Sequence, residues 1–413
     1  MNKIIVHNIG VLVSPLGSSA KAGSEQADVQ RLRNSYVVAQ DGVFTHTGTG
    51  EPPDKLLYGA QVFDAGGRLA TPGLVDAHTH LVFGGWRAHE LQQKLAGVPY
   101  LEILKSGGGI LDTVRATRAA SQQELVEKSQ TTLSGMLAQG TTTAEAKSGY
   151  GLDLENELKQ LRAVQQLQML QPVSLVSTLM AAHALPKEYG QDRQGYLTLI
   201  IDKIIPAIAR EGLAEFCDVF CDSGVFTVSE SRDILQAAHA HGLRAKIHAD
   251  EIDAIGGSEL AGELGAISAE HLIAMRDSGI HSLKAGNTIA CLLPATSFYL
   301  DKPYARARDL IAAGVPVAVA SDFNPGSCPG YSLQLCINLA SWKYKMTPEE
   351  ILNAVTLNAA AAIGRADKAG SIERGKQADL LLWEADSLEF LCYRFGSNLV
   401  HTVFKNGIPV VQN

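Results

Sequence analysis

Two histidines, His78 and His80, constrain the fold of this 413-residue chain more than any other feature. They close an apolar run, PGLVDAHTHL (72–81), and stand two residues apart. On a β-strand, side chains two residues apart point to the same face. The two imidazoles would therefore project toward one point, where a metal ion could accept a nitrogen from each. The rest of the chain then has to supply further ligands and a place for a substrate.

The bulk composition is that of a globular enzyme-sized protein and excludes several classes. The chain is 46% hydrophobic and 19% charged, with a formal net charge of -8 and no Lys/Arg cluster, so nothing favours nucleic acid binding. No apolar run is long enough for a membrane span. The N-terminal MNKIIVHNIGVLVSP lacks the apolar core of a signal peptide. We expect a cytoplasmic protein whose six sparse cysteines are reduced core thiols, the C-x3-C pair Cys217 and Cys221 included.

The middle of the chain, residues 71–365, alternates between candidate strands and stretches with helical apolar spacing. Gly140 and Gly242 stand where two of these helices should end. Eight strands, each followed by helical sequence, are the pattern of a (β/α)8 TIM barrel. The predicted strands are 73–81, 141–148, 173–184, 214–222, 244–251, 266–272, 288–297 and 316–322.

The two ends of the chain, residues 1–70 and 366–413, differ from the middle. Their sequence predicts short strands separated by turns. Asp41-Gly42 between apolar runs predicts a hairpin. Residues 15–33 are rich in small residues and then charged, and we expect a surface loop there. Because chain termini often lie close together, both ends are expected to build one small β domain beside the catalytic barrel of 71–365.

Polar residues gather at the predicted strand ends. In a TIM barrel the chemistry lies at the C-terminal ends of the strands. A single histidine there is as often a hydrogen-bonded structural residue as a ligand, but five of the chain's twelve histidines fall at this one rim. The set favours a functional site and comprises His78, His80, His183, His248 and His271, with Arg87, Lys147, Tyr150, Glu251, Asp322 and Asn324 close by in sequence.

We expect His78, His80, His248 and Asp322 to bind one divalent metal ion. Three imidazoles and a carboxylate suit Zn or Fe, and the ion would activate a water for hydrolysis. A second ion would need a bridging Lys or Glu at the end of the fourth strand. That stretch, VFCDSGVF (219–226), offers neither, although Asp222 is present, so one metal per chain is favoured.

Three further residues have a chemical and a structural interpretation each. Glu251 is placed to shuttle a proton; the alternative is an acid at a helix N-terminus, with neighbouring Asp250 as a cap. His271 could stabilise oxyanion charge or be an ordinary core-edge histidine. Arg87 could clamp a substrate carboxylate bidentately or form a surface ion pair.

Two other features are weaker. The glycine-rich stretch at 106–110 is not followed by Lys-Ser/Thr and is therefore no phosphate cradle; it is either a lid over the rim or a simple loop. Lys147, on the second predicted strand, more readily orients a neighbour than carries a metal-bridging carbamate.

Three motifs of the chain resemble those of the amidohydrolase superfamily. PGLVDAHTHL, HADE (248–251) and ASDFNPGS (320–327) carry the resemblance. Longer signatures, HTHLVFGGWRAHE (78–90) and EAKSGYGLDLENELK (145–159), are similar to the members that open the cyclic amide of 4-imidazolone-5-propanoate in histidine degradation, giving N-formimidoyl-L-glutamate. The similarity covers essentially the whole chain.

The resemblance implies a fold and a set of roles. The terminal strands would form the superfamily's small β-sandwich, and the protein would be a homodimer acting on a small molecule. The metal ligands would be His78, His80, His248 and Asp322, and the catalytic groups would be Glu251, His271 and Asp322. Substrate contacts would fall on Arg87, Tyr150, His183, Glu251, Asn324, Gly326 and Ser327.

Two alternatives remain open on the sequence. The His-x-x-Glu pattern of 248–251 is shared with metal-dependent deaminases of the cytosine and guanine type in the same superfamily, and ammonia release would separate the two reactions. A metal-binding barrel without turnover is the non-enzymatic reading. Activity reversed by a chelator would exclude it.

Overall fold

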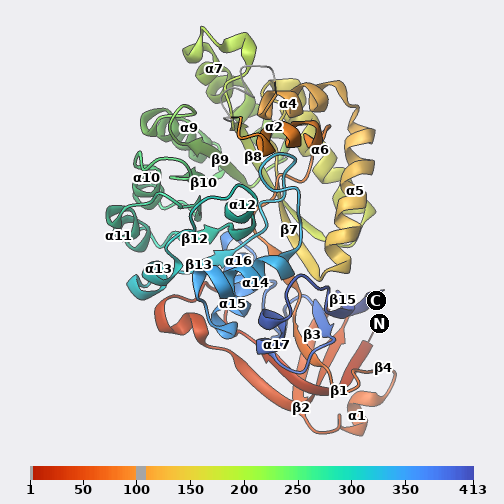
Figure 1. Cartoon of the computed structure of the whole chain (residues 1–413). Helices are drawn as coiled ribbons and strands as arrows, with labels where there is room; N and C mark the ends of the chain where they lie inside the picture. The colour runs from red at the N-terminus through yellow and green to blue at the C-terminus, as the bar shows by residue number, and fades with distance from the viewer. Residues whose placement is uncertain (1–2, 99–107) are drawn as a thin grey trace.

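Eight parallel strands form the barrel expected for the middle of the chain (Figure 1), in a computed structural model that describes residues 3–98 and 108–413. The strands are ordered as in the sequence, from β6 to β13. Beyond their ends, a parallel bridge between Thr79 and Phe323 joins the first strand to the last. The strands are β6 Leu74–Asp76, β7 Thr141–Lys147, β8 Ser174–Ala182, β9 Phe216–Cys221, β10 Arg244–Ala249, β11 Ser268–His271, β12 Ile289–Leu292 and β13 Val317–Val319.

All eight predicted strands are present, but several are shorter than predicted. β6 ends at Asp76, so His78 and His80 lie on an extension that the Thr79–Phe323 bridge holds in place. The predicted seventh strand ran to residue 297, whereas its last part is the helix α12, Pro294–Tyr299. Proline fixes φ near the helical value and lacks the N–H that a first helical residue leaves unpaired, so it starts a helix readily.

Helices surround the barrel and fill its connections (Figure 1). Capping boxes at Ser121/Glu124 and Thr227/Glu230 start α5 and α9. Gly140 and Gly242 follow these two helices with φ of 96° and 84°, as a helix end requires. The helices are η2 Ala88–Glu90, α2 Leu91–Leu95, α4 Ile110–Ala119, α5 Gln122–Ala138, α6 Leu154–Leu170, η3 Lys187–Tyr189, α7 Arg193–Leu199, the π-helical η4 Ile200–Ile204, α8 Ile205–Glu211, α9 Val228–Ala240, α10 Gly257–Glu263, α11 Asp277–Ala285, α12, α13 Ala307–Ala313, α14 Leu333–Tyr344, α15 Pro348–Ala354 and α16 Leu357–Ala362.

Strands from both ends of the chain form a second, separate sheet, as expected. Its order is β16-β15-β14-β5-β1-β2-β3, with β4 parallel to β1. The predicted hairpin joins β2 to β3 through Asp41 and Gly42, whose φ values of 50° and 88° match a two-residue turn. The elements are β1 Lys3–Ser14, η1 Gly23–Ala27, β2 Gln30–Gln40, β3 Val43–Thr49, α1 Asp54–Leu57, β4 Gln61–Asp64, β5 Leu69–Pro72, β14 Leu380–Trp383, α17 Leu388–Tyr393, β15 Val400–Lys405 and β16 Ile408–Gln412.

The surface loop predicted for residues 15–33 is wrong in part. Residues 30–33 already belong to β2. Gln26 is fully buried, and its carboxamide exchanges two hydrogen bonds of 3.0 Å with the backbone of Val317. Because this amide pairs with the backbone N–H and carbonyl of Val317 in the barrel strand β13, the segment packs against the barrel.

The strand β14 connects the two parts of the molecule. Leu380 and Leu382 point into the apolar core of the terminal sheet, together with Ile4 and Phe404. Leu381 and Trp383, on the opposite face of the strand, belong to the barrel core. The period-2 alternation of a strand thus fixes the sheet against the barrel. Within residues 3–98 and 108–413, no helix has the length and apolarity that crossing a membrane requires.

Candidate active site

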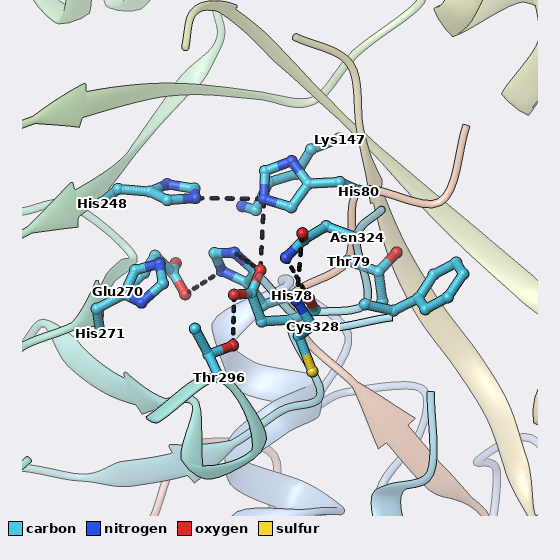
Figure 2. Close-up of polar contacts among 12 residues, drawn as sticks. His78, Thr79, His80, Lys147, His248, Glu270, His271, Thr296, Asn324 and Cys328 are labelled. Carbon is cyan, nitrogen blue, oxygen red and sulfur yellow. Dashed lines mark hydrogen bonds and ion pairs between the residues drawn. The ribbon is translucent and has the colours of Figure 1, made fainter. Parts of the chain in front are cut away.

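Four side chains converge at the C-terminal rim of the barrel. Figure 2 shows three of them, His78, His80 and His248, and Asp322 lies beside the first two. Nε2 of His78 lies 3.4 Å and Nε2 of His80 lies 3.6 Å from Oδ1 of Asp322. Nε2 of His248 lies 3.4 Å from Nε2 of His80. Ligand atoms around a tetrahedral zinc ion with bonds of about 2.1 Å are roughly 3.4 Å apart. These three separations match that value. His78, His80 and Asp322 form one group of possible metal ligands, and His78, His248 and His271 form another.

In two of the histidines, a carboxylate at Nδ1 fixes which ring nitrogen carries the hydrogen. Nδ1 of His78 lies 2.9 Å from Oε2 of Glu270, and Nδ1 of His248 lies 3.0 Å from Oδ2 of Asp218. An ionised carboxylate can only accept a hydrogen bond, so Nδ1 carries the hydrogen and Nε2 presents a lone pair to the site. Burial lowers the pKa of His78 well below its usual value, and its buried Nε2 has no hydrogen-bond partner among the described residues. A metal ion would satisfy that atom.

A fully buried charged network holds these carboxylates in place. Lys147 Nζ lies 2.7 Å from Asp218 and 2.8 Å from Glu145. Lys246 Nζ lies 2.9 Å from Glu145 and 3.4 Å from Glu270. Three carboxylates and two ammonium groups therefore leave one negative charge in excess beneath the histidines. This complements a dication at the rim.

Sequence reasoning found only Lys147 of this network, as a residue that orients a neighbour, and the ion pairs agree with that role. Glu145, Asp218, Lys246 and Glu270 were missed. A signal was present, because Glu145 and Lys147 stand two apart on β7, and Lys246 stands two before His248 on β10. Charged residues in phase with a ligand on a buried strand share its inward face.

Glu251 and His271 face each other beside the four converging side chains. Oε2 of Glu251 lies 3.5 Å from Nε2 of His271. Burial, and then the charge of Asp322, raise the pKa of Glu251 to about 8. His271 and Asp322 have φ of 68° and 55°, a left-handed conformation that is costly for residues other than glycine and clusters at functional sites. Thr296 Oγ1 holds Asp322 in place by donating to its Oδ2 at 2.6 Å.

The loop after β13 is organised by the side chain of Asn324. Its Oδ1 accepts the backbone N–H groups of Gly326 and Ser327 at 2.8 and 2.7 Å, and its Nδ2 donates to the carbonyl of Asp322 at 2.8 Å. The predicted substrate contact Asn324 thus has its amide engaged in its own turn. The backbone of this turn and Ser327 remain at the rim.

Tyr150, His183 and Arg87 line the same rim. His183 stacks on His80 with ring centroids 4.9 Å apart, and Tyr150 lies 5.2 Å from His183. Nδ1 of His183 donates to the carbonyl of Gly149 at 3.1 Å, which leaves Nε2 as an acceptor. The Arg87 side chain is only 9% exposed, so it is not a surface ion-pair residue.

Three neighbouring features have structural roles. Asp222 accepts the backbone N–H groups of residues 251, 252 and 253, so its carboxylate is engaged in holding this loop. Asp250 accepts two N–H groups at the start of α10, as the cap interpretation expected. The proposed lid at 106–110 lies partly outside the described residues. Within the described part, Gly109 donates its N–H to Glu90 Oε1 at 2.6 Å.

Comparison with known proteins adds a family and close relatives. The model of the amidohydrolase family matches residues 69–410. The imidazolonepropionase of Fusobacterium nucleatum is 50% identical over 98% of both chains, and that of Bacillus cereus is 52% identical over 91% of this chain and 89% of its own length. Among solved structures, E. coli guanine deaminase has a TM-score of 0.76 at 14% identity over both whole chains. The 5-methylcytosine deaminase of Klebsiella pneumoniae has a TM-score of 0.74 at 18% identity, covering 99% and 98%. The last two likenesses concern the fold alone.

Proposed function

The chain belongs to the amidohydrolase family, and we propose that it catalyses the reaction of the imidazolonepropionases, the hydrolysis of 4-imidazolone-5-propanoate to N-formimidoyl-L-glutamate in histidine degradation. The observation that carries this proposal is the half-identity to enzymes of that name over nearly the whole length of both chains. The rim supports it, because a cluster suited to a metal and a buried arginine are what a cyclic amide with a carboxylate requires.

The family is metal-dependent, and we assign one ion of Zn or Fe to His78, His80, His248 and Asp322. The spacing of their ligand atoms and the unpartnered, buried Nε2 of His78 support this assignment. When bound, such an ion supplies an activated water and polarises the carbonyl of the substrate. The buried excess of negative charge below His78 and His248 favours a dication over an empty, neutral cluster of imidazoles.

The remaining steps belong to side chains. Glu251 takes a proton from the attacking water, and His271 donates a hydrogen bond to the oxygen that develops negative charge. A C–O bond forms at the ring carbonyl carbon, the adjacent ring C–N bond breaks, and Glu251 or Asp322 returns the proton to the leaving nitrogen. Arg87 and Tyr150 hold the propionate, so that the ring carbonyl is oriented toward the histidines.

The test is to load purified protein with Zn²⁺ or Fe²⁺ and to follow the consumption of 4-imidazolone-5-propanoate, with parallel assays of N-formimidoyl-L-glutamate and ammonia. We expect product without ammonia, and about one metal ion per chain by elemental analysis. Ammonia in proportion to substrate consumed would contradict the proposal and favour a deaminase. Two ions per chain would contradict the single-metal assignment.

Glu251→Gln tests the proton transfer within this reaction. We expect kcat to fall by about 10²–10⁴-fold, the usual range for the loss of a general acid–base group, while the metal content is unchanged. Asp253→Asn is the matched control, since Asp253 is an exposed acid in the same loop and its side chain has no assigned role. If both variants kept wild-type kcat, Glu251 would not be the proton carrier.

We also propose that the protein is a cytoplasmic homodimer, as the resemblance to its family implies. Size-exclusion chromatography with light scattering at micromolar concentration would report twice the mass of the 44.0 kDa chain. A monomer under these conditions would contradict the proposal.

A further inference from the structure

Gly326 lies against Arg87 so closely that it leaves no space for a side chain. A Cβ atom added to Gly326 would stand 1.0 Å from Nη2 of Arg87, 2.0 Å from its Cζ and 2.7 Å from its Nε. These distances mean overlap, because non-bonded carbon and nitrogen atoms do not approach that closely. The guanidinium therefore occupies the volume that any other residue at 326 would fill.

The backbone at Gly326 has no room to retreat. Its N–H donates to Asn324 Oδ1 at 2.8 Å, and the N–H of Ser327 donates to the same oxygen at 2.7 Å. The N–H of Asn324 donates to the carbonyl of Cys328 at 2.9 Å and closes the turn. The turn is thus rigid, and it begins only two residues after Asp322. A collision at residue 326 has to be relieved by the arginine.

The guanidinium also lies near the carboxylate of Glu90. Nε of Arg87 lies 3.8 Å from Oε2 of Glu90, and the Glu90 carboxylate is anchored by the N–H of Gly109 at 2.6 Å. Glu90 is 2% exposed and the Arg87 side chain is 9% exposed. Arg87 belongs to the loop following β6, and its largely buried side chain packs against the loop following β13.

The conformation of Gly326 separates this role from the usual reasons for a glycine. Gly326 is not among the glycines with a positive φ, so alanine would fit its backbone without strain. The three nearest atoms that a Cβ would meet all belong to the guanidinium end of the flexible Arg87 side chain. Alanine at this position would consequently spare the fold and displace the guanidinium by roughly 2.5 Å, enough to bring Nη2 from 1.0 Å back to van der Waals contact at about 3.5 Å.

We propose that Gly326 is a specificity-determining positioning residue, which acts by leaving the space in which Arg87 holds the substrate carboxylate. The inference deepens the proposed function and rests on the assignment of Arg87 as the carboxylate clamp. The carboxylate-binding site then depends on Arg87 after β6 and on Gly326 after β13. A larger residue at 326 would weaken the preference for a substrate that carries a carboxylate.

The test is a double-mutant cycle of Gly326→Ala and Arg87→Ala in the metal-loaded enzyme. We expect Gly326→Ala to raise KM for 4-imidazolone-5-propanoate about 10–100-fold, as expected for a misplaced binding group, with kcat changed less than threefold. We expect the same increase in Ki for the probe 3-(imidazol-4-yl)propanoate. In the Arg87→Ala background, Gly326→Ala should change KM less than twofold, because there is no guanidinium left to displace.

Gly330→Ala is the matched control. Gly330 lies in the same loop, is exposed, and a Cβ there meets nothing within 4 Å. It should leave KM, kcat and the thermal midpoint unchanged. A thermal midpoint of Gly326→Ala within about 2 °C of wild type would verify that the fold is intact.

The measurements distinguish an error in the assignment of Arg87 from an error in the role of Gly326. If Arg87→Ala leaves KM unchanged, the clamp assignment within the proposed function is wrong. If Arg87→Ala raises KM but Gly326→Ala does not, or if the two effects multiply in the double variant, the role of Gly326 is wrong and the proposed function stands.

Discussion

Two buried lysine–aspartate ion pairs of the same length serve different ends in the two parts of the molecule. Lys147 and Asp218 lie 2.7 Å apart inside the barrel, and Lys405 and Asp379 lie 2.7 Å apart in the terminal sheet. The carboxylate of Asp218 also contacts Nδ1 of His248 at 3.0 Å, whereas the carboxylate of Asp379 also accepts the backbone N–H of Asn406 at 3.0 Å. The same pair thus orients a candidate metal ligand in one region and closes a turn in the other. The geometry of an ion pair does not reveal its function, but its next partner does.

The surroundings of the two pairs differ as well. The barrel pair belongs to five charged side chains with no exposure, whereas the terminal sheet is built on an apolar cluster that includes Ile4, Leu380 and Phe404. Charges in the barrel interior depend on one another for compensation, because removing one leaves another uncompensated in a low dielectric. The stability of the terminal sheet instead depends on apolar burial.

The largest expected effect is that of Lys147→Met. This substitution leaves Glu145 and Asp218 without their shared cation, and we expect the free energy of unfolding to fall by about 3–5 kcal/mol. Lys405→Met leaves one carboxylate, which keeps the N–H of Asn406, and should cost roughly 1–3 kcal/mol. Urea denaturation of the metal-free variants measures both. An equal or larger cost for Lys405→Met would break the contrast between the two pairs.

The second effect concerns the apolar cluster of the terminal sheet. Leu380→Ala removes a side chain that is 2% exposed and should cost about 3 kcal/mol in the free energy of unfolding. Because the cluster does not reach the rim, the metal content and KM of the folded variant should equal those of wild type. Ile408→Ala, at a side chain that is 48% exposed in the same sheet, serves as the control with little expected change. A loss of metal from Leu380→Ala would mean that the two regions are coupled.

The third effect separates the two aspartates directly. Asp218→Asn removes the negative charge and one of the two acceptor oxygens that face Lys147 and the backbone N–H and Nδ1–H of His248, and we expect metal affinity to fall about 10–100-fold. Asp379→Asn changes a pair of the same length and should leave metal affinity within about twofold of wild type. Competition with a chelator of known affinity gives both values without an activity assay. Equal losses in the two variants would contradict the orienting role of Asp218.

The smallest effect is expected at the partly exposed ion pair of Arg193 and Glu230, which serves as a comparison for the two buried lysine–aspartate pairs. The hydrogen bond from Arg193 is the first cause that lowers the pKa of Glu230 to about 2. A depressed pKa stabilises the fold above the unfolded value near 4.5, and that stability is lost as the pH falls toward 2. Glu230→Gln should therefore cost about 1 kcal/mol at pH 7, since the Arg193 side chain is 36% exposed and solvent screens the pair, and almost nothing near pH 2. Glutamine keeps the capping box of α9, so a cost that persisted at low pH would point to a different cause.

Much of the fold could be predicted from the sequence because apolar periodicity is a local property. The eight barrel strands and the helices between them have clear patterns, and the Asp41-Gly42 hairpin follows from the conformations that those residues favour. The boundaries at residues 81 and 322 were wrong, since an extended chain past a strand end looks the same in sequence as the strand itself. The boundary at residue 297 was wrong because Pro294 starts a helix inside the predicted strand.

The candidate site divides in the same way. His78, His80, His248 and Asp322 could be proposed from the rule that polar residues at strand ends of a barrel meet at one rim. The charged network below them could not be assembled, because which of Glu145, Asp218, Lys246 and Glu270 pair depends on the register between neighbouring strands. The docking of Gln26 on Val317 was hidden for a similar reason, since its partner stands far away along the chain.

By itself, then, the sequence determined the class of fold, the residue types available at the rim and the family to which they belong. Only the tertiary structure decided how those residues meet: that Asp322 reaches His78 across the closing bridge, that Asp218 and Glu270 set the free nitrogen of two histidines, and that Arg87 occupies the space left by Gly326. The physical reason is that periodicity along a chain is local, whereas hydrogen bonds, ion pairs and excluded volume depend on which segments the closed barrel brings into contact.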